Sequence, residues 1–147
     1  MYRFYRLLIL MGIALCALPA RAHHLAVVVP AENHADSISS ADLTRILKSE
    51  LKKWPNGNDV VVVITKGSPS TLQVIERLCN LSASDAKAWI AAHPAAFIQA
   101  GTDAEVLAIV RNRPGALGIV DVHSIDGQLH VLKVDGKLPL EMGYLPH

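Results

Sequence analysis

Residues 60–77 read Val-Val-Val-Val-Ile-Thr-Lys-Gly-Ser-Pro-Ser-Thr-Leu-Gln-Val-Ile-Glu-Arg, and the rest of the chain can be arranged around them. The five β-branched apolar residues at 60–64 offer no polar face to water, which is typical of a strand buried on both sides of a sheet. Gly67 then permits a tight bend, Ser68 is a good helix N-cap, and Pro69 suits the first helical position. Apolar side chains follow at helical spacing, at Leu72, Val74, Ile75 and Leu78. The stretch therefore predicts a buried strand, a turn and a helix.

This predicted junction is also the best candidate for a binding site. A strand that turns directly into a helix points unpaired backbone N–H groups towards the carboxyl end of a sheet. The positive end of the helix dipole lies at the same place, where anions bind in many α/β proteins. We therefore expect any ligand site of this chain at residues 66–71.

The first 22 residues have the pattern of a cleaved export signal. Arg3 and Arg6 precede an apolar run over residues 7–18, and Ala20-Arg21-Ala22 places small residues at both positions that signal peptidase reads. The run has about 12 residues, fewer than the roughly 20 that span a bilayer, so a retained membrane anchor is the weaker interpretation. We predict cleavage after Ala22 and one mature domain over residues 23–147 that does not span a membrane.

The composition of this mature chain argues against a nucleic-acid-binding protein and against a disulfide-stabilised one. Loss of the three leader arginines leaves 11 basic and 13 acidic side chains, a net charge of about −2. This charge gives no basic surface of the kind that nucleic acids need, so we expect no nucleic-acid partner. Cys79 becomes the only cysteine, so no internal disulfide is expected, and its place on an apolar helix face predicts a buried side chain.

Before the central stretch, the sequence predicts one strand and one helix. Residues 25–29 form a short apolar run that ends at a proline, which is typical of a strand, and residues 32–40 read as a polar loop. Ser39 or Ser40 caps a helix that ends near Ser49. Trp54 lies in a turn-forming segment, and we expect it to pack against the domain.

After the central stretch, two capping boxes and two strands are predicted. Ser82 with Asp85, and Thr102 with Glu105, open helices that end near residues 93 and 112. Residues 116–120 predict a strand in which Gly118 marks the close approach of another element. Residues 129–134 predict an edge strand, and the last ten residues predict a strap or a loose tail.

Strands that alternate with helices predict an α/β domain with a mostly parallel sheet flanked by helices. The sequence has no metal-ligand spacing such as His-x-x-x-His, no Gly-x-Ser-x-Gly motif and no Walker loop. No His or Lys is clearly placed to activate Ser68 or Ser70 as a nucleophile. We therefore expect a binding protein rather than an enzyme, with no catalytic residue, cofactor or metal site.

Three blocks of sequence, in their order and spacing, carry a resemblance to a known family. Residues 43–57 contain Leu-x-x-Ile followed by Trp-x-Asn-Gly, residues 65–71 read Thr-Lys-Gly-Ser-Pro-Ser-Thr, and residues 113–120 read Arg-Pro-Gly-Ala-Leu-Gly-Ile-Val. Together they resemble the periplasmic phosphate-binding protein family of phosphate ABC transporters, in particular its short single-lobe relatives. The resemblance runs from about residue 27 to residue 134.

The resemblance implies a periplasmic domain with one lobe of the type II periplasmic-binding-protein fold. It implies that phosphate or a similar small oxyanion binds at the strand-turn-helix junction, and that the protein is linked to phosphate uptake or sensing. The implied ligand-binding residues are Lys66, Gly67, Ser68, Ser70 and Thr71. The implied partner, besides the inorganic anion, is a membrane transporter or another envelope protein.

Two differences from the family pattern predict weak binding. Pro69 stands where the family has Gly and removes a backbone donor, and Ile64 stands where an Arg usually contacts the anion, a loss that Lys66 offsets only in part. Three charge-assisted hydrogen bonds contribute about 6 kcal/mol, against an association cost of at least about 4 kcal/mol. The difference corresponds to millimolar binding or weaker for an isolated lobe. A dimer or a partner protein would be needed to complete a tight site.

Two other functions are compatible with the sequence. If Ser68 is only a helix cap, the domain is a ligand-free protein-interaction module of the cell envelope. Cleavage after Ala22 would also give His23 a free amine beside its imidazole, and together with His24 this group could bind copper.

Overall fold

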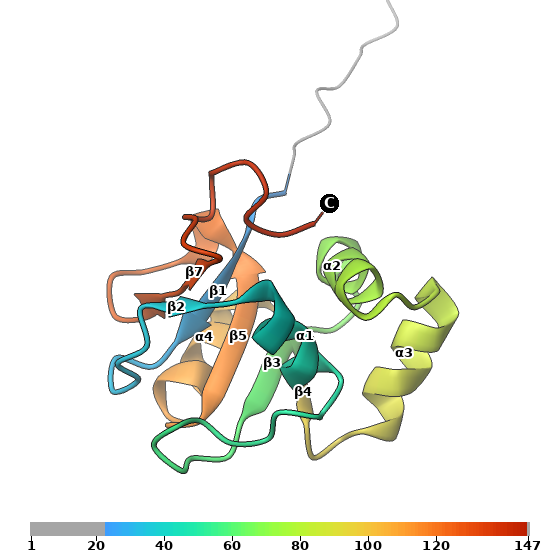
Figure 1. Cartoon of the computed structure of the whole chain (residues 1–147), viewed down its shortest axis with the longest axis horizontal. Coiled ribbons are helices and arrows are strands. Elements are labelled where there is room, and N and C mark those ends of the chain that lie inside the picture. Colours follow the sequence, from blue (N-terminus) through green and yellow to red (C-terminus); the bar gives the residue numbers. More distant parts are fainter. Residues whose placement is uncertain (1–22, 147) are drawn as a thin grey trace, which may run out of the picture.

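The computed structural model describes residues 23–146. The predicted export signal and its cleavage site after Ala22 lie outside the described residues, as does His147. The described chain has three layers, with one sheet between two layers of helices (Figure 1). Within residues 23–146, no helix has the length and apolar character needed to cross a membrane.

The central sheet has the strand order β4-β3-β5-β1-β6. Its strands are β1 (Leu25–Val29), β3 (Val61–Thr65), β4 (Phe97–Ala100), β5 (Ala116–Asp121) and β6 (His130–Val131). β3 pairs in parallel with β4 and β5, whereas β1 is antiparallel to both β5 and β6. Four of the five strands therefore share one direction, which confirms the predicted mostly parallel α/β sheet.

β3 is the buried interior strand that the sequence predicts. Its apolar residues, Val61 to Ile64, are each no more than 6% exposed. Val63 lies opposite Ile98 of β4 on one side and Gly118 of β5 on the other. The strand needs apolar side chains on both faces because helices cover both faces of the sheet.

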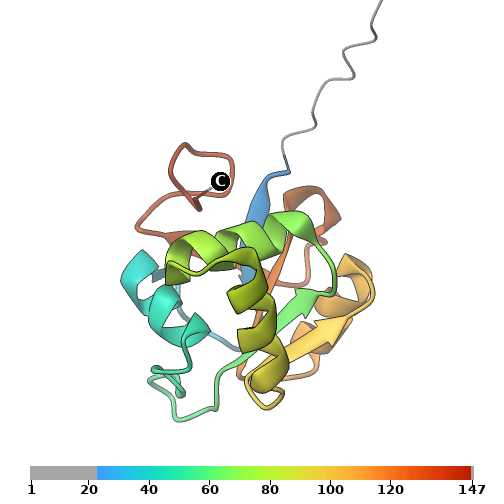
Figure 2. The ribbon, with the colours of Figure 1, turned by 90° about the vertical axis from the view of Figure 1, so that its right-hand side faces the viewer.

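Four helices form the outer layers. α1 (Ser40–Leu47), α2 (Pro69–Cys79) and α3 (Ala83–Ala92) cover one face of the sheet, and α4 (Asp103–Arg111) covers the other (Figures 1 and 2). Each helix begins at a predicted cap, where a hydroxyl accepts a hydrogen bond from a backbone N–H in the first turn. The four capping residues are Ser39, Ser68, Ser82 and Thr102.

Three packing predictions are confirmed. A Cβ at Gly118 would lie 2.9 Å from a side-chain atom of Val110 on α4, so this glycine does mark a close approach. Trp54 is 8% exposed and donates from Nε1 to the carbonyl of Gly115 at 3.0 Å. Cys79 is buried, and its desolvation raises the pKa of the thiol.

Three strand assignments differ from the predictions. β4 was not predicted, because residues 94–100 contain a single β-branched residue, Ile98, and show no alternation. β2 (Ser37–Ile38) lies inside the predicted polar loop and pairs in parallel with β7 (Lys133–Val134). The predicted edge strand over residues 129–134 is therefore divided between β6 and β7, which belong to two different sheets.

The last residues form a strap rather than a loose tail. Tyr144 is 3% exposed, and its hydroxyl donates to the carbonyl of Leu132 at 2.6 Å. The same hydroxyl accepts a hydrogen bond from the N–H of Val27 in β1 at 3.0 Å. Tyr144 therefore fastens the end of the described chain to the first strand.

Candidate functional site

The turn between β3 and α2 has the local structure that its sequence dictates. Gly67 has φ +74, a conformation that side chains rarely adopt. Ser68 has an extended backbone, and its Oγ accepts from the N–H of Thr71 at 3.3 Å. Pro69 occupies the first helical turn, where its missing N–H costs nothing.

The backbone of this turn leaves few N–H groups for a ligand. The N–H of Lys66 donates to Ala100 and that of Ser68 donates to Thr65. Among residues 66–71, only Gly67 and Ser70 therefore keep a backbone N–H without a partner in the described chain. Thr71 is 2% exposed and its N–H is already used, so it offers less to an anion than its sequence position suggests.

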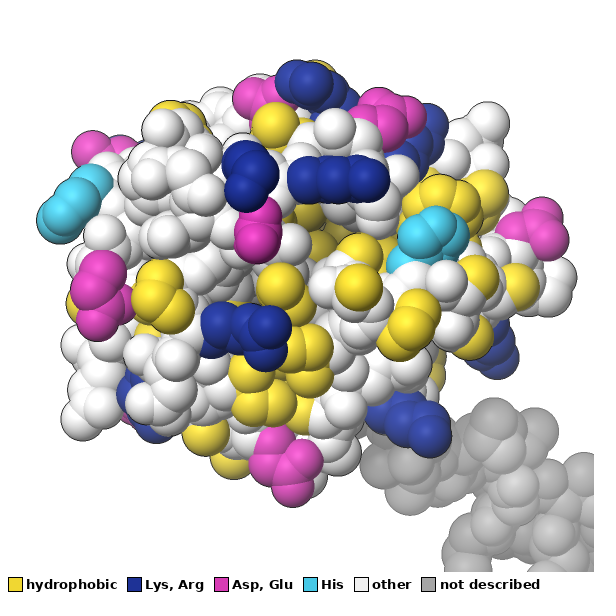
Figure 3. All heavy atoms as spheres, turned by 90° about the horizontal axis from the view of Figure 1, so that it is seen from below, with side chains coloured by type: hydrophobic (Ala, Val, Ile, Leu, Met, Phe, Trp, Pro, Cys, Tyr) yellow, Lys and Arg dark blue, Asp and Glu magenta, His cyan; other side chains and the backbone are white. Residues whose placement is uncertain are grey.

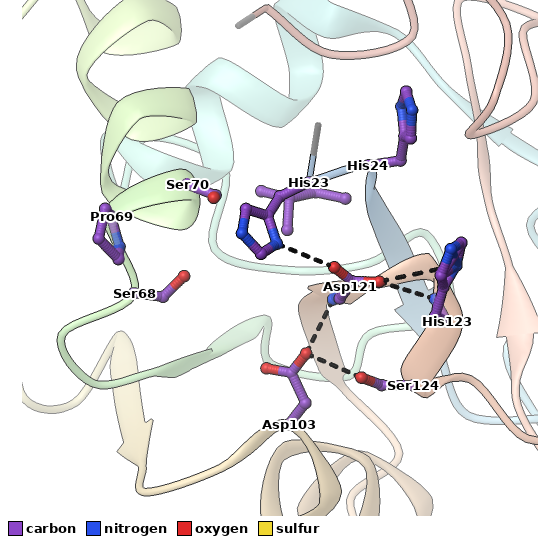
Figure 4. A pocket seen from close by; sticks show the side chains of 10 residues that line it. His23, His24, Ser68, Pro69, Ser70, Asp103, Asp121, His123 and Ser124 are labelled. Atoms are coloured by element: carbon purple, nitrogen blue, oxygen red, sulfur yellow. Dashed lines mark hydrogen bonds and ion pairs between the residues drawn. The ribbon is translucent and has the colours of Figure 1, made fainter. Parts of the chain in front are cut away.

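Ser68 and Ser70 line a cavity of about 800 Å³ at the carboxyl ends of three parallel strands. The turn follows β3, the opposite wall includes the last residue of β5, and the start of α4 follows β4. Figure 4 shows both hydroxyls directed towards the cavity, across from His23 and Asp103. The polar residues of the other walls are His23, His24, Asp103, Asp121, His123 and Ser124.

Asp103, at the first position of α4, connects three strand ends. Its Oδ1 accepts from the hydroxyl of Thr65 at 2.5 Å, and its Oδ2 accepts from the N–H of Asp121 at 2.9 Å. The hydroxyl of Ser124 donates to the same Oδ2 at 3.1 Å. These three bonds fix the far wall of the cavity relative to β3.

Asp121 brings two histidines to the cavity. Its Oδ2 lies 3.3 Å from Nδ1 of His23, and its Oδ1 accepts from the N–H of His123 at 2.8 Å (Figure 4). Desolvation raises the pKa of Asp121, but the hydrogen bonds from the two histidines lower it, and the net pKa lies below the ordinary value. The carboxylate is therefore ionised at neutral pH and opposes an anion in the cavity.

The five residues predicted for the site do not all face this cavity. Ser68 and Ser70 line it, whereas Lys66, Gly67 and Thr71 line a separate hollow of about 460 Å³ between α2 and α3, to which Ser68 also contributes. Lys66, the basic residue of the turn, therefore lines the hollow and not the cavity. The cavity that Ser68 and Ser70 line also contains the histidines and the carboxylates, whereas the hollow, within the described chain, contains neither.

Sequence reasoning missed the acidic wall. Asp121 directly follows an apolar strand, which is a signal that was available. Asp103 follows β4, and because β4 was not recognised its position at a strand end was hidden. The pairing of Asp121 with His23, 98 residues earlier, leaves no trace in local sequence.

The cavity lacks the contacts of an activated nucleophile or a metal centre. In residues 23–146, neither Ser68 nor Ser70 makes a hydrogen bond from its hydroxyl to His23, which a serine nucleophile would need. The described chain also holds no group of three His, Cys, Asp or Glu side chains placed to bind a metal ion.

Comparisons by sequence and by structure give different results. No protein-family model matches the sequence, and no curated protein matches it. The fold is similar to that of an ABC-type phosphate transport receptor from Vibrio cholerae, with TM-score 0.61, 19% identity, and 79% of this chain matched to 48% of that one.

Two further solved structures give the same picture. A putative phosphate ABC transporter substrate-binding protein from Clostridium perfringens, solved with bound phosphate, has TM-score 0.64 at 17% identity, and 79% of this chain covers 46% of it. PstS from Borrelia burgdorferi has TM-score 0.63 at 17% identity, and 79% of this chain covers 49% of it. The chain spans less than half the length of each, and the fold that the resemblance implied is confirmed.

Proposed function

We propose that this chain is an exported, non-catalytic solute-binding domain that binds phosphate or a similar small oxyanion at the N-terminus of α2. The observation that carries the proposal is the opening of this helix end, with the hydroxyls of Ser68 and Ser70, into a cavity where three parallel strands end. Helix N-termini and hydroxyl groups are favourable partners of oxyanions. The bound phosphate of a structure with a similar fold supports this choice of ligand.

The proposed binding is weak in the isolated chain for two reasons. The turn offers few hydrogen-bond donors, and carboxylates in the cavity wall repel an anion. Pro69 has no N–H and the N–H of Thr71 is engaged by Ser68. The carboxyl groups of Asp103 and Asp121 lie on the opposite wall. His23 and His123 line the same cavity beside these carboxylates.

We also propose that a partner completes the site. The chain covers less than half of the solved substrate-binding proteins that share its fold. A second copy, or an envelope protein such as a transporter component, would cover the open side of the cavity and supply further donors. The domain would then serve phosphate uptake or sensing in the periplasm.

NMR titration of the mature chain with phosphate and sulfate tests this function. The expected shifts centre on Ser68 and Ser70 and saturate at millimolar anion or above. Added salt should weaken the binding.

A pair of matched serine variants makes the test specific. Ser70→Ala keeps the backbone N–H but removes one hydroxyl, and should weaken phosphate binding about threefold or more. Ser84 occupies the same position in α3, two residues after the N-cap Ser82, and does not line the cavity. Ser84→Ala should therefore leave the phosphate affinity unchanged. Equal effects of both variants would contradict binding at α2.

The alternative function is a ligand-free interaction module, and the acidic wall of Asp103 and Asp121 is the observation that favours it. An absence of shifts at tens of millimolar phosphate, in the monomer and in any natural oligomer, would support this module. Copper binding by His23 and His24 remains a separate proposal, tested by copper titration of the mature chain with and without these two residues.

A further inference from the structure

A second hollow lies at the opposite end of the sheet, where the parallel strands begin. It has a volume of about 510 Å³ and is bordered by the end of α1, the start of β3 and the segment between α3 and β4. Figure 3 shows this face, with apolar side chains gathered in its hollowed middle and basic side chains around them. The volume lies within the range of small-molecule sites.

The floor of this hollow is apolar. It is formed by aliphatic side chains of α1, of the segment before β3 and of the segment before β4. The main contributors are Ile46, Leu51, Val60, Val61, Pro94 and Ala96. An uncharged hydrocarbon group would be desolvated here, whereas inorganic phosphate would gain nothing from such a floor.

The rim of the hollow carries two basic side chains without acidic partners. Lys52 and Arg113 line it, are exposed, and form no ion pair within residues 23–146. The acidic residue of the rim, Asp59, is instead bound to Lys53 at 2.7 Å. The rim therefore presents unpaired positive charge beside the apolar floor.

A buried hydroxyl without a partner also belongs to this hollow. Ser49 lines it, and its Oγ is buried and has no hydrogen-bond partner within the described chain. Buried polar atoms of folded proteins are almost always hydrogen-bonded. This oxygen is closed to solvent, so it lies behind the wall of the hollow and is not itself a ligand contact.

We propose that this hollow binds a small organic anion with one carboxylate head and a short hydrocarbon body. The carboxylate lies at the rim with Lys52 and Arg113, and the hydrocarbon body lies on the apolar floor. The site is separate from the proposed oxyanion site, because the two lie at opposite ends of β3. It does not depend on phosphate binding.

Octanoate is the probe, and octanol is its uncharged match. In NMR titrations of the mature chain, octanoate should shift the amides of Ser49, Leu51, Lys52 and Ala96, and octanol should bind several-fold more weakly. Phosphate should leave these amides unchanged. Equal binding of octanol and octanoate, octanoate shifts centred elsewhere, or no octanoate shifts at millimolar concentrations would each overturn the proposal.

Charge-matched variants locate the head group. Lys52→Gln and Arg113→Gln should each weaken octanoate binding about threefold or more, and should leave octanol binding unchanged. Lys48→Gln removes the same charge from an exposed residue that does not line the hollow, and should have no effect. An equal loss in the Lys48 and Lys52 variants would overturn the proposed position of the carboxylate.

Discussion

At the scale of single residues, Tyr144 combines a buried phenol ring with a hydroxyl that makes two hydrogen bonds. Its hydroxyl accepts from the N–H of Val27 in β1 and donates to the carbonyl of Leu132, between β6 and β7, so backbone groups fill both roles. Burial raises the pKa of Tyr144 to about 12, although the hydrogen bond from Val27 lowers it. The folded state therefore holds the phenolic proton more tightly than the unfolded chain.

The raised pKa of Tyr144 predicts how the free energy of unfolding changes at alkaline pH. The contribution of Tyr144 is fully present below pH 10.0, the ordinary value, and is lost as the pH rises through about 12. The free energy of unfolding should fall by up to about 3 kcal/mol across this window from this group. Tyr144 is the only tyrosine of residues 23–147, so phenolate absorbance of a protein that begins at His23 reports it directly.

A phenylalanine variant is the control for this assignment. Tyr144→Phe removes both hydrogen bonds and leaves the backbone groups of Val27 and Leu132 without this partner. It should lower the free energy of unfolding at neutral pH by about 1 to 3 kcal/mol and should remove part of the alkaline dependence. A phenolate titration of the folded protein near pH 10 would contradict the buried environment.

Replacing Asp121 should have two opposite effects, a loss of stability and a gain in anion affinity. Its lowered pKa means that its ionised form stabilises the fold above the ordinary carboxyl value of 3.8, and that this contribution is lost as the pH falls through the lower folded value. Asp121→Asn should therefore be less stable than the natural protein at neutral pH, and the difference should shrink in acid.

The same substitution should improve anion binding, because it removes a negative charge from the cavity wall. An increase of about two- to fivefold in sulfate affinity is expected at neutral pH. Urea unfolding at two pH values and the NMR titration measure the two effects. Weaker sulfate binding by Asp121→Asn would mean that the carboxylate assists the anion rather than opposing it.

At the scale of elements, the buried strand, the turn and α2 were predictable because each carries its own local signal. The uniform apolar run, the permissive Gly67 and the Ser68-Pro69 cap need no distant partner to be recognised. β4 and the two-residue strands β2 and β7 could not be predicted, because they are strands only through the partners that pair with them. Local sequence indicates the strand propensity of a segment, whereas strand pairing depends on the whole fold.

The loop before β3 and the turn before β5 depend on one glycine. A Cβ at Gly115 would lie 1.8 Å from the carbonyl oxygen of Asp59, a backbone atom that cannot move alone. The carbonyl of Gly115 also accepts hydrogen bonds from Trp54 and Val61. Gly115→Ala should therefore lower the free energy of unfolding by about 3 kcal/mol or prevent folding.

Gly127 is the matched control for this prediction. A Cβ at Gly127 would meet no atom within 4 Å, and its φ is not positive. Gly127→Ala should therefore change the free energy of unfolding by less than about 0.5 kcal/mol in urea denaturation. Similar midpoints for the two variants would show that the Gly115 turn can relax.

At the scale of the whole molecule, the cavity is a product of the fold rather than of any one motif. Ser68 and Ser70 were predictable from a helix cap, whereas Asp103, Asp121 and His123 reach the cavity from two later parts of the chain. The sequence therefore predicted the donor side of the site and could not predict the side that opposes it. The balance of these two sides determines whether an anion binds.

The proposed export would place the new N-terminus of the chain at this cavity. We predict that intact-mass analysis of protein from the cell envelope gives a chain that begins at His23, and a mass that retains Met1 would contradict this. Cleavage would create a positive amine on His23, which lines the cavity. Mature protein with its native end should therefore bind sulfate more tightly than protein with extra residues before His23.

The position of β1 determines when the sheet can be completed during synthesis. β1 is the first strand to be made, yet Val28 pairs with Gly118, about ninety residues later, and with Val131 later still. The hydrogen bond from the N–H of Val27 likewise needs the hydroxyl of Tyr144, which is made near the end of the chain. A growing chain thus holds this apolar strand without a partner until nearly all of the chain has been made, which favours slow, late folding. Late folding would suit the proposed export, because the chain would still be unfolded when it is translocated.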